Sequence, residues 1–142
     1  MSAALKLKKG TFKHVEHELS LYHETRKEMM RLRNEIMYTR PSDDENVGGG
    51  RSSMPGDPTG RTATALATNR RLQHLETTVD AIEEVYNRLP PEKQRLVHLL
   101  YWTKPQLLSW DGIAQEVKVG RATAFRWRDE IVFAVGHLLG WR

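Results

Sequence analysis

Basic side chains are concentrated between residues 118 and 128, and their types are suited to binding nucleic acid. The basic residues are Lys118, Arg121, Arg126 and Arg128, which are expected on the exposed half of a helix, and Ala122 and Phe125 lie among them. An arginine can donate two parallel hydrogen bonds to a guanine edge, whereas a lysine holds a phosphate as a point charge. We therefore predict base contacts from Arg121 and Arg126 and a phosphate contact from Lys118. Phe125 is expected to pack on a thymine methyl group.

Two helices joined by a short turn would position these side chains. The segment SWDGIAQEVKVGRATAFRWRDE, residues 109–130, has the spacing of a DNA-binding helix-turn-helix, in which the start of the second helix enters the major groove. Ser109 is expected to cap the first helix, and the second is expected to span residues 121–133. Lys118 occupies a turn position that often holds glycine. The left-handed conformation is costly for lysine, so the turn should differ in detail from the commonest form.

A third helix, over residues 92–101, completes a small C-terminal unit. Pro90 and Pro91 precede it, and a turn over residues 102–105 follows it. Gly140 stands where a C-terminal glycine cap belongs, and Trp141 is expected to fold back. The predicted core of this unit contains Leu96, Leu99, Leu100, Ile113, Val117, Ala124, Trp127, Ile131 and Val135.

Two long amphipathic helices are predicted before this unit. The first should begin at Thr11 and end near Tyr38, and the second should span residues 63–88. Both have apolar residues at spacings of three and four, so they should pair with each other or with those of a second subunit. In an antiparallel pair, Arg26 and Arg33 of the first helix could face the acidic residues Glu76, Asp80 and Glu83 of the second.

The segment between these helices, residues 40–62, is predicted to be irregular. It contains three consecutive glycines and three prolines, which exclude a continuous helix or strand. Such a stretch is long for a connection inside a compact domain. It is therefore either a linker or a functional loop.

The amino-acid composition favours an acidic polymer as a binding partner. The sequence contains no set of residues that is typical of a catalytic site. The chain carries 22 Lys and Arg against 18 Asp and Glu, and residues 1–40 hold nine of these basic residues against five acidic ones. There is no cysteine, and the spacing of His14 and His17 lacks a third metal ligand. No catalytic or phosphate-loop motif is present, so we expect neither an enzyme nor a cofactor. No apolar run is long enough to span a membrane, and we expect a cytoplasmic protein.

Several stretches resemble one known family. They are YWTKPQLLSWDGIA (101–114), RATAFRWRDEIV (121–132), LLGWR (138–142), GGGRSSMPGDPT (48–59) and LETTVDAIEEVYNRLP (75–90). Together they resemble the phage transcriptional activators of the RinA type, close to the ArpU group, over nearly the whole chain after about residue 20. The C-terminal unit also resembles the final, promoter-reading region of sigma factors.

The resemblance implies an activator of late genes in a phage or prophage, acting in the cytoplasm of a bacterial host at its nucleoid. Double-stranded DNA is the expected partner, and host RNA polymerase and a second copy of the chain are further candidates. The expected fold is all-α, with a coiled-coil-like N-terminal region (1–89) and a helix-turn-helix domain (90–142). The alternative function is the small subunit of a phage terminase, which recognises DNA for packaging.

Overall fold

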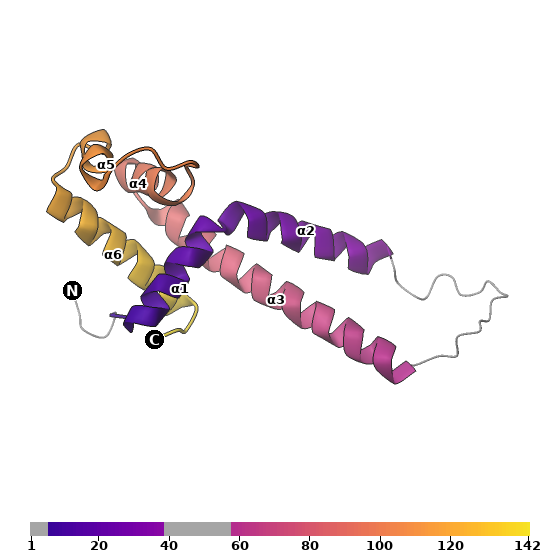
Figure 1. Cartoon of the computed structure of the whole chain (residues 1–142). Helices are drawn as coiled ribbons and strands as arrows, with labels where there is room; N and C mark the ends of the chain where they lie inside the picture. The colour runs from indigo at the N-terminus through magenta and orange to yellow at the C-terminus, as the bar shows by residue number, and fades with distance from the viewer. Residues whose placement is uncertain (1–5, 39–57) are drawn as a thin grey trace. The chain divides into compact units, whose positions relative to one another are not determined.

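The computed structural model describes residues 6–38 and 58–142, and these residues form six helices and no strand (Figure 1). The helices are α1 (Lys9–Ser20), α2 (Tyr22–Tyr38), α3 (Pro58–Arg88), α4 (Pro91–Tyr101), α5 (Trp110–Glu116) and α6 (Arg121–Leu138). The predicted all-α class is confirmed. Within the described ranges, no helix combines the length and the apolar character needed to cross a membrane.

The chain divides into two compact units. The first contains residues 1–23 and 78–142, and the second contains residues 24–77. These units do not coincide with the predicted domains, 1–89 and 90–142. The difference arises because α1 and the last turns of α3 pack with the C-terminal helices, a long-range association that local sequence patterns do not encode.

The predicted single helix from Thr11 to Tyr38 is wrong, because the structure contains two helices in that range. α1 begins at Lys9, two residues before the predicted cap, and Leu21 separates it from α2. At the break, the Ser20 hydroxyl donates to the His17 carbonyl oxygen at 2.8 Å. Such a bond from a serine side chain to its own helix competes with the backbone ladder and bends helices.

The prediction for residues 40–62 needs correction at its end. α3 begins at Pro58, so residues 58–62 are helical. A proline suits the first turn of a helix because its missing N–H would have no partner there. The remainder of the predicted irregular segment, residues 40–57, lies outside the described residues.

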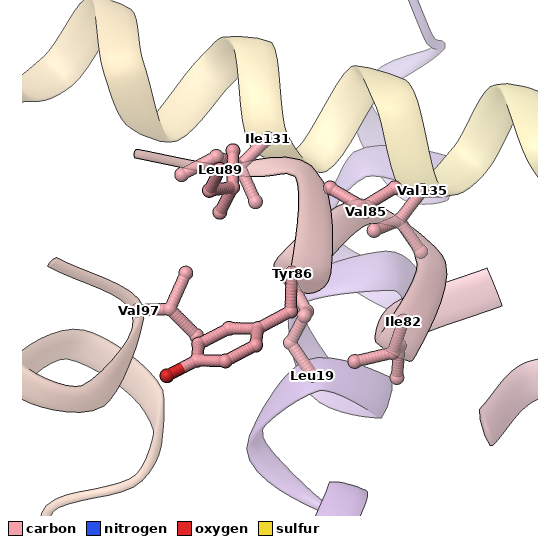
Figure 2. A pocket seen from close by; sticks show the side chains of 8 residues that line it. All are labelled: Leu19, Ile82, Val85, Tyr86, Leu89, Val97, Ile131 and Val135. Atoms are coloured by element: carbon pink, nitrogen blue, oxygen red, sulfur yellow. The ribbon is translucent and has the colours of Figure 1, made fainter. Parts of the chain in front are cut away.

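The core of the first unit is built from α1, α3, α4 and α6 together. Figure 2 shows their side chains turned toward a common space that has no room for a water molecule. The side chains drawn are Leu19, Ile82, Val85, Tyr86, Leu89, Val97, Ile131 and Val135. The predicted core named only residues between the start of α4 and the end of α6, and three of these, Leu99, Leu100 and Trp127, are only partly buried.

Polar contacts also fasten α1 to this core. Glu16 accepts a hydrogen bond from the Tyr101 hydroxyl at 2.5 Å, and its carboxylate lies 3.6 Å from Arg128 Nη1. Trp102 Nε1 donates to the Leu19 carbonyl oxygen at 2.9 Å, at the end of α1 where carbonyls lack partners within the helix. α1 therefore belongs to the same folded body as α4 and α6.

The second unit contains most of α2 and the first two-thirds of α3. Thr25, Met29 and Leu32 are buried at spacings of four and three. Arg33 of α2 pairs with Glu76 of α3 at 2.8 Å, which is one of the facing pairs that the sequence allowed for antiparallel helices.

A second set of charged side chains in this unit is centred on Glu28. Hydrogen bonding from Arg31 holds the pKa of the Glu28 carboxyl at about 2, and Arg71 of α3 lies 3.4 Å from the same carboxylate. α2 and α3 thus pair within one chain.

The end of α6 forms the predicted glycine cap. Gly140 adopts a left-handed φ of 75°, its N–H donates to the His137 carbonyl oxygen, and the Trp141 N–H donates to that of Gly136. This is the hydrogen-bond pattern of a Schellman motif. Trp141 folds back as expected, and its ring stacks on His14 of α1 with 4.5 Å between centroids.

We expect Gly140→Ala to destabilise the protein by about 1 kcal/mol, because an alanine is strained at positive φ. No atom lies within 4 Å of the added methyl group, so a change in stability would reflect the strained backbone conformation and not a steric clash. Gly10→Ala is the matched control: its methyl group is equally unobstructed inside α1 and should stabilise by about 0.5–1 kcal/mol. Thermal or urea unfolding measures both. Equal effects at the two sites would contradict the cap assignment.

Candidate nucleic-acid interface

The first helix of the candidate interface begins as the sequence predicts. The backbone N–H of Gly112 donates to Ser109 Oγ at 3.1 Å, so Ser109 caps α5. Ile113, Ala114 and Val117 are buried, at 2%, 4% and 5% exposure. These three side chains hold α5 against the rest of the unit and leave its opposite side in solvent.

The turn between α5 and α6 depends on the conformation of Lys118. This residue has a φ of 61°, so it adopts the left-handed conformation despite the cost for lysine, and the expected difference from the commonest form of the turn is not found. Its N–H donates to the Gln115 carbonyl oxygen, and the Val119 N–H donates to that of Ala114. The turn thus repeats the Schellman pattern with a lysine where glycine is usual. The Lys118 side chain is exposed.

The first two turns of α6 present most of the predicted contact residues. Arg121, Ala122 and Arg126 are exposed, and Phe125 is partly buried. The Arg121 guanidinium carbon lies 5.3 Å from the centre of the Phe125 ring, and Arg121 Nη1 is 4.0 Å from Asp111 Oδ1. These contacts are loose and solvent-exposed, so the guanidinium can exchange them for an external anion at little cost.

Arg128 lies in different surroundings from the other basic residues. Its side chain is only 21% exposed, and its Nε donates to Asp129 Oδ1 at 2.7 Å. The guanidinium carbon lies 5.2 Å from the Phe12 ring centre, 5.3 Å from Trp110 and 5.4 Å from Phe125. Arg128 therefore joins α1, α5 and α6, a role that its position in the sequence did not reveal.

Aromatic packing against α5 supports the exposed start of α6. Trp110 lies 4.3 Å from Phe125 between ring centres, so it packs between helices. Ala124 and Ile131 are buried as predicted, at 0% and 3% exposure. Trp127, predicted in the core with them, is only partly buried, and Lys93 Nζ lies 5.4 Å from its ring centre.

α6 is longer than predicted because α1 covers its second half. The expected end was Phe133, but the helix continues to Leu138. The rings of Phe12 and Phe133 meet edge to face, 5.7 Å apart. Leu7 lies so close to Gly136 that an added methyl group there would come within 2.6 Å of it. These contacts give the last turns of α6 a tertiary partner that the sequence pattern does not show.

The described residues thus define an all-α protein with a short helix, a tight turn and a longer helix that begins with exposed basic side chains. A family model described as "Protein of unknown function (DUF722)" matches residues 13–136, so the chain belongs to this family. The comparisons with curated proteins and with solved structures found no match.

The two neighbouring arginines of α6 should respond differently to truncation. Arg128→Ala removes three ring contacts and the positive charge beside the Glu16 carboxylate, so we expect a loss of about 1–3 kcal/mol in the free energy of unfolding. Arg126→Ala removes only an exposed side chain and should change stability by no more than about 0.5 kcal/mol. Urea unfolding of the two variants makes the comparison. Similar losses for both would refute the structural role of Arg128.

Proposed function

We propose that this protein is a sequence-specific DNA-binding transcriptional activator of phage or prophage genes. In this proposal α5, the turn and α6 act as a helix-turn-helix, and the first two turns of α6 enter the major groove. Arg121 and Arg126 contact base edges, Ala122 and Phe125 pack on thymine methyl groups, and Lys118 holds a phosphate. Arg128 positions Phe125 and contributes its charge at the edge of the site.

One observation carries the proposal: the start of α6 is well supported by the helices behind it, and its arginine side chains are exposed to solvent. Ser109, Lys118 and the buried Ala124 fix the angle between α5 and α6. The arginines at 121 and 126 lie on the solvent side of this frame. A rigid helix with exposed arginine forks is the arrangement that reads base pairs, because the forks must be held in register with the groove.

The activator role and the phage context rest on the resemblance to the RinA and ArpU groups, not on geometry. They extend the proposal to action in the cytoplasm of a bacterial host and to contact with host RNA polymerase. A homodimer is also part of the proposal. Met37 and Leu66, in the second unit, are 63% and 55% exposed, which leaves apolar surface for a second copy.

We expect the full chain to select particular fragments from a library of phage DNA and to bind them in a salt-dependent manner. With about four to five phosphates neutralised, log affinity should fall against log salt with a slope of about −4. Fragments upstream of late genes would support activation, and fragments at packaging ends would favour the terminase small subunit. Paired half-sites would support the dimer. Binding that does not change with salt, or no selection of fragments, would refute the proposal.

Two single variants should distinguish a residue that contacts bases from one that contacts phosphate. Arg126→Ala should cost about 1–3 kcal/mol on the selected site and relax its sequence preference, because a bidentate base contact is lost. Lys118→Gly keeps the left-handed turn, removes the charge, and should weaken binding to all sequences by a similar factor. Gel-shift titrations on the selected and on scrambled duplexes measure both. Equal losses on both duplexes for Arg126→Ala would show that this residue does not read bases.

A further inference from the structure

One row of side chains along α6 is exposed at the start of the helix and buried at its end. Arg121, Phe125, Arg128, Val132 and Gly136 follow one another at spacings of three and four, so they lie on one face. At the start of this row Arg121 is exposed, whereas Val132 and Gly136 at its end are buried. α1 provides the cover at that end.

The contacts of α1 show where its first turn lies. Phe12 packs on Phe133 and on the Arg128 guanidinium, and Arg128 in turn contacts Phe125. One guanidinium therefore lies close to the ring of Phe12 on α1 and to that of Phe125 on α6. The start of α1 thus adjoins the exposed half of the row.

This start of α1 is strongly basic. Lys6, Lys8, Lys9 and Lys13 are all exposed, and no acidic residue occurs between residues 6 and 14. Lys9 and Lys13 are four residues apart and therefore share one face of the helix. Lys13 also follows Phe12 directly, so its backbone is fixed by the packing of that ring.

We propose that the lysines at the start of α1 form a second DNA contact, which holds the phosphate backbone beside the groove that α6 enters. A helix that inserts its first turns into the major groove leaves the groove across the phosphate strand. The second half of α6 is the part that would make this passage, and it is there that α1, the helix that carries Lys9 and Lys13, packs on α6. Lysine suits this role because it neutralises phosphate without demanding a base.

This second contact rests on the proposed DNA binding. It assigns affinity and sequence preference to different groups of residues. Contacts from Lys9 and Lys13 would set the affinity for any duplex, whereas Arg121 and Arg126 would set the choice of sequence. Removing the lysine charges should therefore lower the salt slope and the affinity on selected and scrambled duplexes alike. The ratio between the two affinities should stay constant.

The test compares double variants of the full chain in gel-shift titrations across a salt series. Lys9→Gln with Lys13→Gln should make the slope shallower by about 2 and lower affinity roughly 10- to 30-fold near 0.15 M salt. Lys9→Arg with Lys13→Arg keeps both charges and should retain the slope. The matched control, Lys27→Gln with Arg70→Gln, removes two exposed charges from the second unit and should leave the slope unchanged. Melting temperatures verify that each variant is folded.

The outcomes separate this inference from the proposed function. If the natural chain binds DNA through Arg126 and the Lys9/Lys13 glutamine variant keeps the full slope, the second contact is refuted and DNA reading by α6 stands. Equal losses in the glutamine variant and its control would also refute it, because the effect would then reflect net charge alone. If the natural chain binds no duplex, the proposed function fails and this inference fails with it.

Discussion

The contact between Glu16, Tyr101 and Arg128 is the interaction on which the first unit depends. Its three side chains come from α1, α4 and α6, and they meet where the surrounding helices partly bury them. Burial, reinforced by the hydrogen bond to Glu16, raises the pKa of the Tyr101 hydroxyl, so the phenol remains a donor. Because the arginine also stacks on rings from α1, α5 and α6, the start of the chain is joined to its end through one guanidinium.

Features governed by neighbouring residues could be predicted from the sequence. The Ser109 cap and the glycine cap at Gly140 each depend on interactions within a few positions. The expected departure of the turn at Lys118 from the commonest form was wrong, because this lysine adopts the left-handed conformation. The pairing of Arg33 with Glu76 is long-range, but two helices that pack their apolar faces together in antiparallel orientation bring only a few charged residues opposite Arg33, and Glu76 is one of them. For the two helix caps, the residues within one helical turn are enough to predict the geometry.

The largest differences from the sequence predictions involve α1. Its amphipathic pattern was assigned to a helical pair with α3, yet Val15 and Leu19 are buried in the same unit as α4 and α6. The break at Leu21 makes this possible, and only the Ser20 hydroxyl signals it locally. Arg128 was misplaced among the exposed arginines for the same reason, since the rings and carboxylate that hold it include residues more than a hundred positions away.

The association of α1 with α6 limits what the candidate interface can do. A helix exposed along its whole length could lie in a groove at several depths, whereas α6 has one face covered from about Arg128 onward. In the proposed binding to DNA, the first two turns of α6 would be the part that enters the groove, and this would determine which side chains reach bases. The packing that stabilises the unit would thus also set the register of the arginines at 121 and 126, so stability and recognition share the same contacts.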